Sequence, residues 1–121
     1  MPGNQPDVGD VYQVYRNATA SPASVGNLVR PMACVAARPS DPVAWGAIAR
    51  SSTDGRPNDG DVASAVQPAL GLEKEGHWSL RWLHSVLKEK TGTSACEYKG
   101  SLVDPERSAV INLYRNRLKQ T

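Results

Sequence analysis

Short segments with the apolar pattern of β-strands fill the first two thirds of the chain. Apolar and polar residues alternate in 10–16 and in 77–83, and the second segment places Trp78, Leu80 and Trp82 on one face of a predicted strand. Strands are also predicted over 32–37, which is apolar enough to be buried on both faces, and over 43–49, 62–67 and 85–90.

A helix is predicted at the C-terminal end, over 104–119. Asp104 is suited to the N-cap position, Pro105 fits the first helical position, and Glu106 lies where the helix dipole favours an anion. Apolar side chains then recur at helical spacing, at Val110, Leu113, Tyr114 and Leu118.

Strands followed by a terminal helix predict an α+β fold that is mainly β, with about five to seven short strands forming a small barrel. A chain of 121 residues closes one modest core but not two, so a single domain over 1–121 is expected. Within it, the barrel is predicted over about 8–90, an irregular segment over 91–103 and the helix over 104–119.

Charge and cysteine content narrow the class of protein. The formal net charge is +2, but the C-terminal third is basic and the loop at 54–61 is acidic, a split that suits an anionic ligand. Cys34 and Cys96 lie far apart without a ligand motif, so neither a metal site nor a disulfide framework is expected. The N-terminus has no signal-peptide pattern and no run reaches membrane-spanning length, so the cytoplasm is the expected location, with no membrane partner.

Five motifs follow one another in a recognisable order. They are GDVYQV (9–14), RPMACVAA (30–37), WGAIARSST (45–53), EKEGHWSLRWLHSV (73–86) and GSLVDPERSAVINLYRNRL (100–118). Their order and spacing resemble the MazF/PemK-like toxin family, the endoribonuclease half of bacterial toxin–antitoxin pairs. The resemblance covers about residues 8–118, nearly the whole chain.

The resemblance implies an SH3-like β-barrel that forms a homodimer, cleaves single-stranded RNA without a metal ion or other cofactor, and is neutralised by a cognate antitoxin. In the family, an arginine before a proline and a hydroxyl residue in the loop after the next strand carry the chemistry. At the matching positions of this sequence stand Arg30 and Ser51.

The chemistry of RNA cleavage gives these residue types a physical role. Attack by the ribose 2′-hydroxyl needs a proton acceptor, a cation at the phosphate and a proton for the departing 5′-oxygen. Arg30 can hold two phosphate oxygens with its planar fork, whereas Ser51 can orient a phosphate but cannot act as a base unaided. His77 and His84 are the candidate bases, because imidazole is the side chain suited to proton transfer near neutral pH. Further RNA contacts are predicted at Arg50, Ser52, Thr53, Arg56 and Arg81.

One departure from the family leaves an alternative function open. The family commonly has an Asp-Gln pair in the strand after the E-x-x-G turn, where this chain has Arg81 and Trp82. The alternative is a non-catalytic barrel that inhibits or regulates a host protein by binding, as the gyrase-directed relatives of this fold do, or a phage or mobile-element effector. Arg30 could then serve only as a salt-bridge partner at the mouth of its strand, and Trp78 and Trp82 only as core residues.

Overall fold

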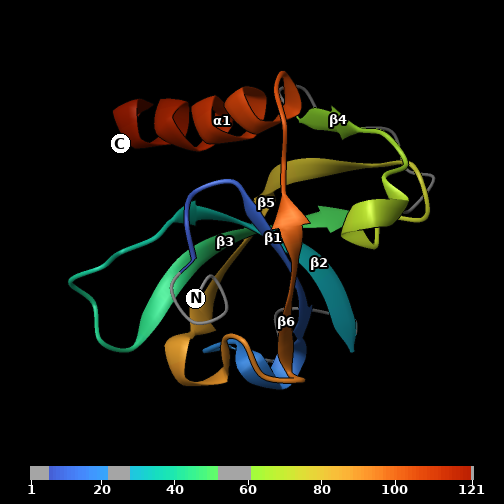
Figure 1. Ribbon diagram of the computed structural model, residues 1–121. Helices are drawn as coiled ribbons and strands as arrows, with labels where there is room; N and C mark the ends of the chain where they lie inside the picture. The colour runs from blue at the N-terminus through green and yellow to red at the C-terminus, as the bar shows by residue number, and fades with distance from the viewer. Residues whose placement is uncertain (1–5, 22–27, 52–60, 121) are drawn as a thin grey trace.

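The computed structural model describes residues 6–21, 28–51 and 61–120 (Figure 1). They form six strands, three short 3-10 helices and one α-helix. In chain order these are β1 (Asp10–Tyr15), η1 (Arg16–Ala18), β2 (Val29–Ala36), β3 (Ala44–Ser51), β4 (Val62–Ser64), η3 (Pro68–Leu70), β5 (Gly76–Leu87), η4 (Lys88–Lys90), β6 (Cys96–Ser101) and α1 (Glu106–Gln120). None of the helices in this part of the chain has the length and apolarity needed to pass through a bilayer.

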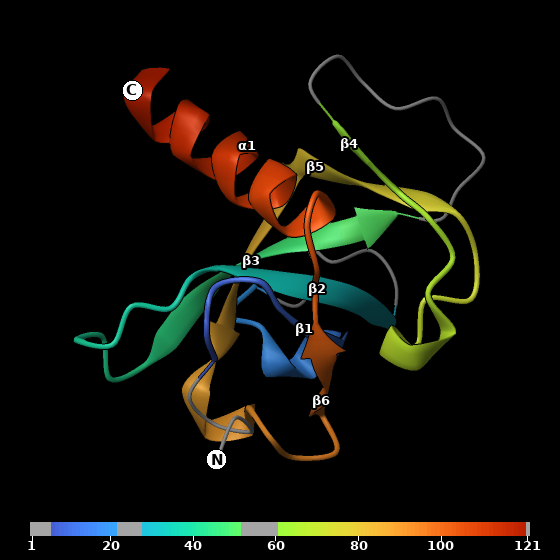
Figure 2. The same ribbon diagram turned by 45° about the horizontal axis from the view of Figure 1, so that its top comes forward.

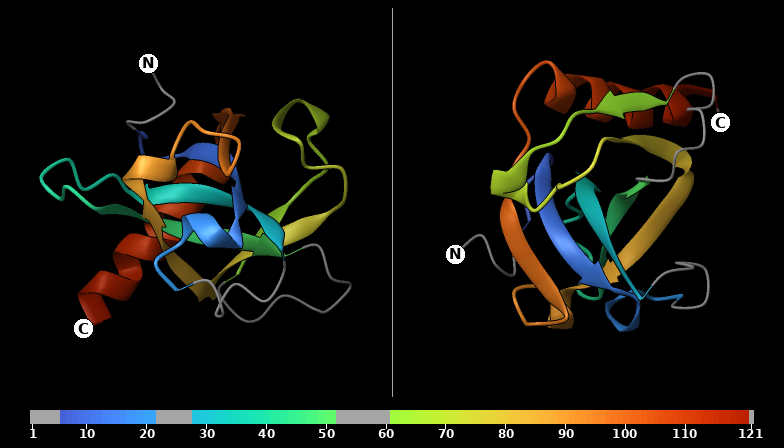
Figure 3. Two further views of the ribbon diagram at one scale, coloured as in Figure 1. Left: turned by 90° about the horizontal axis from the view of Figure 1, so that it is seen from below. Right: turned by 90° about the vertical axis from the view of Figure 1, so that its right-hand side faces the viewer.

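The strands make one antiparallel sheet in the order β4-β5-β3-β2-β1-β6. The segment after η1 returns to β5, where Thr19 bridges Val86 and the amide of Ala20 donates to the carbonyl of Ser85 over 2.9 Å. This contact holds the sheet in a curled half-barrel, which is visible in end view in Figure 3. The predicted fold class, mainly β with a small barrel and a C-terminal helix, is therefore confirmed.

Two clusters of buried side chains lie on the two faces of the curled sheet. The interior cluster has Tyr12, Val14, Met32, Cys34, Trp45, Ala47, Ala49, Val86 and Cys96 among its members. The helix-side cluster lies on the face that α1 covers (Figure 2) and includes Val11, Ala33, Val35, Ile48, Leu72, Trp78, Leu102 and Val110. Because β2 lies in the middle of the sheet, its successive side chains enter the two clusters in turn. The prediction that this strand is buried on both faces is confirmed for Met32 to Val35.

The long strand β5 changes face along its length, and here one expectation is wrong. Ile48 pairs with Leu83 and Arg50 pairs with Trp78, so β5 carries three residues more than β3 between these two pairs. The backbone amide of Arg81 donates to the Ser79 hydroxyl over 3.2 Å, as such local side-chain bonds do where a strand leaves regular geometry. As a result Trp78 packs in the helix-side cluster while Trp82 packs against the interior cluster, instead of sharing one face with it.

The segment predicted to be irregular contains a strand. Residues 96–101 form β6, which pairs with β1 from Asp10 opposite Ser101 to Val14 opposite Cys96. This strand follows no strong local pattern; its long-range pairing with β1 stabilises it. The strand predicted over 85–90 is only partly present. Residues 85–87 are the end of β5, and residues 88–90 form the 3-10 helix η4.

The terminal helix begins two residues after the predicted start. It runs over Glu106–Gln120, and an Asp104 carboxylate oxygen accepts hydrogen bonds from the amide and the hydroxyl of Ser108. The Glu106 carboxylate accepts hydrogen bonds from the Trp78 indole, over 2.6 Å, and from the Gln67 amide, over 2.8 Å. These bonds hold the start of α1 against β5 and the segment before η3.

Candidate functional site

Three of the predicted site residues lie side by side on one face of the sheet. Ser51 on β3 is paired with His77 on β5. On the other side of β3, the ladder with β2 begins at the pair Met32–Ala49, and Arg30 and Ser51 each lie two residues beyond this pair, on the same face of their strands as Met32 and Ala49. Arg30, Ser51 and His77 therefore form a row across three neighbouring strands, and we call this row with its immediate contacts the Arg30 face.

Arg30 lies within this face because β2 begins at Val29, three residues before the start of the strand predicted over 32–37. The ladder between β2 and β3 starts at Met32, so Pro31 interrupts no hydrogen bond on that side. The Arg30 side chain is 9% exposed, and its guanidinium carbon lies 5.0 Å from the centre of the Trp82 ring. Burial lowers the pKa of Arg30 from its ordinary value, and a contact with an aromatic face offsets part of the cost of burying the cation.

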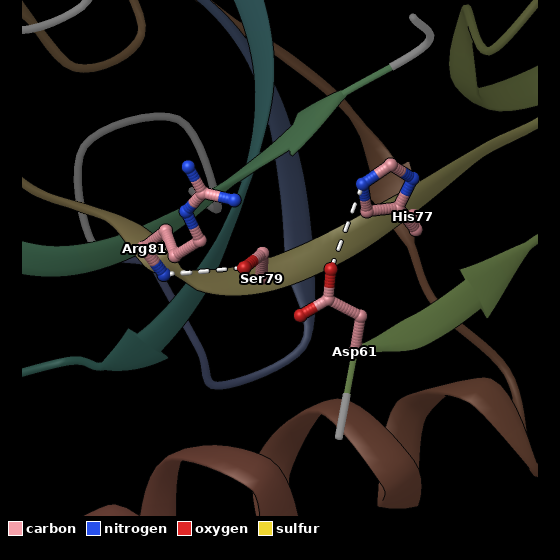
Figure 4. A network of polar contacts seen from close by, with 4 residues as sticks. All are labelled: Asp61, His77, Ser79 and Arg81. Atoms are coloured by element: carbon pink, nitrogen blue, oxygen red, sulfur yellow. Dashed lines mark hydrogen bonds and ion pairs between the residues drawn. The ribbon is translucent and has the colours of Figure 1, made fainter. Parts of the chain in front are cut away.

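The acidic residue Asp61 joins the row beside His77 (Figure 4). Asp61 directly precedes β4, two residues before Ala63, and Ala63 pairs with His77. Its Oδ2 is 3.6 Å from His77 Nε2, and both side chains are only 5% exposed. This distance is too long for a hydrogen bond but allows an ion pair when the imidazole carries a proton.

Trp82 contacts Arg30 and His77 of the Arg30 face and also Arg81, so it is not simply a core residue. Its ring centre lies 5.6 Å from that of His77, 5.0 Å from the Arg30 guanidinium and 5.8 Å from the Arg81 guanidinium. Trp82 is only half-buried and Arg81 is exposed, so this end of the face reaches solvent. Neither Trp82 nor Asp61 was predicted as a site residue. The only sequence signals for them were the Arg81–Trp82 departure from the family and the acidic composition of the loop that ends at Asp61.

Arg50 lies on the opposite face of β3 from Ser51 and points toward α1. Only 3% of it is exposed, and its donors bind the Ser64 hydroxyl at 2.7 Å and the carbonyls of Ser64, Ala65 and Lys74 at 3.1, 3.2 and 2.6 Å. Burial lowers its pKa, and the nearby Glu106 carboxylate partly offsets this. Arg50 therefore ties β3 to the chain on both sides of η3, and its donors are used inside the fold rather than presented to RNA. The other three residues predicted on this loop, Ser52, Thr53 and Arg56, lie outside the described residues.

His84 lies two residues after Trp82 on the interior face of β5, close enough to Arg30 for the guanidinium charge to act on its ring. It lies opposite Ala47 on β5, and within the described ranges its Nε2 is buried and has no hydrogen-bond partner. Burial, and to a smaller extent the positive charge of Arg30, lower the pKa of His84. Burial and Arg30 thus disfavour the imidazolium that would form if His84 accepted a proton, whereas His77 has the Asp61 carboxylate 3.6 Å away, so His77 is the better placed of the two candidate bases.

His84 makes the stability of the protein depend on pH in a defined direction. Because the folded state lowers its pKa, the unfolded chain binds its proton more readily, and stability is lost as pH falls below the unfolded value of about 6.5. Urea unfolding at pH 7.5 and pH 5.5 is expected to show this loss in the wild type and a smaller loss in His84→Leu. Equal losses in the two proteins would exclude His84 as the cause.

The two cysteines take no part in this site. Burial raises the pKa of Cys34 and of Cys96 to about 12, so both thiols remain protonated at neutral pH. Over the residues that the structure describes, no three His, Cys, Asp or Glu side chains are grouped as metal ligands.

Neither the protein-family models nor the curated proteins with which the sequence was compared include a match.

Proposed function

We propose that this protein is a metal-independent endoribonuclease that cleaves single-stranded RNA at short sequences. The observation that carries the proposal is the row of Arg30, Ser51 and His77 on three neighbouring strands, with Asp61 3.6 Å from the His77 ring. The row supplies a cation for a phosphate, a hydroxyl to orient it and an imidazole next to a carboxylate. These are the groups that transfer of the phosphate to the 2′-oxygen requires.

In the proposed reaction the 2′-oxygen attacks the neighbouring phosphorus, and the bond from phosphorus to the 5′-oxygen breaks. His77 accepts the 2′-hydroxyl proton, and Asp61 stabilises the imidazolium that results. Arg30 stabilises the charge that builds up on the phosphate oxygens, while Ser51 orients the phosphate. Water supplies the proton to the departing 5′-oxygen. The products are a 2′,3′-cyclic phosphate and a 5′-hydroxyl end.

The resemblance to the MazF/PemK-like toxins extends the proposal to the biological setting. In the proposed setting, the protein acts in the cytoplasm as a homodimeric toxin with an SH3-like barrel, and a cognate antitoxin neutralises it. An antitoxin segment that is acidic and disordered before binding would pair with the cationic Arg30 face. A short reading frame next to the gene, encoding an acidic C-terminal tail, would support this part of the proposal.

The test is an RNA digestion with mapped ends. Purified protein, incubated with a mixed RNA pool in the presence of a chelator, is expected to yield fragments that begin with a 5′-hydroxyl and share a short sequence at the cut. A His77→Asn preparation, purified in the same way, controls for contaminating nucleases. Fragments that begin with a 5′-phosphate would contradict the mechanism, and the absence of fragments would contradict the enzyme.

One observation favours a second candidate function. Ser51 and His77 are only 3% and 4% exposed, whereas a catalytic group has to touch its substrate. The second candidate is a barrel that inhibits a host protein by binding it, without cleaving RNA. It predicts that no RNA is cut under any condition and that a single host protein co-purifies with the overexpressed chain.

A further inference from the structure

We propose that Trp82, with the Arg81 guanidinium beside it, forms a stacking subsite for an unpaired nucleobase of single-stranded RNA. The subsite adjoins Arg30, so a base stacked there would present its own phosphate to the Arg30 face. This inference takes its substrate class from the proposed function, but it concerns binding and does not require cleavage.

The exposure of Trp82 sets it apart from the other two tryptophans. Trp45 and Trp78 are completely buried in the interior and helix-side clusters, while Trp82 is only half-buried. Its position follows from the irregular part of β5, where the Ser79 hydroxyl takes the Arg81 amide and the strand changes face (Figure 4). Trp82 also packs against the interior cluster, but unlike the other two tryptophans it keeps part of its surface accessible, which packing alone does not require.

The surroundings of Trp82 are cationic and planar. Guanidinium groups lie 5.0 Å and 5.8 Å from its ring centre, and the His77 ring lies 5.6 Å away at an interplanar angle of 46°. Within the described ranges the Arg81 guanidinium makes no hydrogen bond or ion pair, and the side chain is exposed. Bases stack both on aromatic rings and on guanidinium planes, and the phosphates between them require cations.

This combination favours a nucleobase over an acidic peptide. Carboxylates would pair with Arg81 but would leave the indole without a partner, whereas a nucleotide satisfies both groups. Because every base has a π-face, the subsite is expected to accept any base, with a preference for the larger purines. Sequence selectivity would then arise elsewhere on the protein.

The test uses a 2′-O-methyl oligonucleotide, which cannot be cleaved because its 2′-oxygen is blocked. Binding to the wild type is expected to quench tryptophan fluorescence, since Trp45 and Trp78 are shielded. Anisotropy of the labelled oligonucleotide is expected to show about tenfold weaker binding for Trp82→Leu and near-normal binding for Trp82→Phe. Arg81→Gln should weaken binding and reduce its salt dependence by about one phosphate contact. Thermal unfolding of each variant shows whether it is folded. If Trp82→Leu does not fold, the comparison of intact with abasic oligonucleotides carries the test.

An abasic oligonucleotide of the same length separates stacking from attraction to phosphates. It keeps the charges but lacks the bases, so it is expected to bind the wild type about as weakly as the intact oligonucleotide binds Trp82→Leu. Equal binding of abasic and intact oligonucleotides, unchanged binding by a folded Trp82→Leu, or no binding by the wild type would each overturn the subsite. Quenching and stacking by a protein that cuts no RNA would contradict only the proposed cleavage. Cleavage by a protein whose binding ignores Trp82 would contradict only the stacking.

Discussion

Replacing Arg30 with lysine is expected to slow RNA cleavage by about a hundred- to a thousand-fold, the usual cost of removing a donor that stabilises transition-state charge. Lysine keeps the positive charge but loses the planar fork that can hold two phosphate oxygens at once. It also loses the contact between the Arg30 guanidinium and the Trp82 ring, whose centre lies 5.0 Å from the guanidinium carbon. The rate is measured under single-turnover conditions, so that chemistry is separated from product release.

A matched control for this exchange is Arg16→Lys. Arg16 is an exposed arginine in η1, outside the Arg30 face, so this variant should cleave at the wild-type rate. Thermal unfolding of both variants checks that the site has not collapsed, since Arg30 is buried. A folded Arg30→Lys protein with an unchanged rate would remove Arg30 from the mechanism, and with it the strongest link to the toxin family.

Replacing Arg50 with alanine is expected to destabilise the fold by about 3–5 kcal/mol. The exchange removes the four hydrogen bonds to Ser64, Ala65 and Lys74 and leaves their oxygens without the guanidinium in the fold interior. A domain of this size has a total stability of about 5–15 kcal/mol, so the loss is a large part of it. Urea unfolding monitored by circular dichroism measures the change.

The comparison that interprets this result is Arg81→Ala. Arg81 is exposed, so its removal should change stability by no more than about 0.5 kcal/mol. We therefore expect the two arginines to separate, with Arg50 governing stability and Arg81 governing affinity for single strands. If Arg50→Ala were as stable as the wild type but bound RNA poorly, Arg50 would return to the RNA-contact residues that its sequence position suggested.

Part of the candidate site could be predicted from residue types and their order. The Arg-Pro pair drew attention to Arg30, and the scarcity of imidazoles made His77 one of only two candidate bases. The resemblance to the toxin family pointed to Ser51, and the structure pairs this residue with His77 on the neighbouring strand. The partner of His77 could not be predicted, because Asp61 reaches it only through the pairing of β4 with β5, and no local pattern encodes that pairing.

The sequence by itself determined the mainly β class, most of the strands and the terminal helix, because periods of two and of 3.6 residues follow from backbone geometry alone. Only the tertiary structure decided that 96–101 is a strand, since its stability comes from β1. It also decided which face each side chain of β5 occupies. In a strand, one irregular step turns every later side chain to the other face, so the irregular part of β5 near Ser79 placed Trp82 beside Arg30 on the interior face instead of with Trp78 on the helix side.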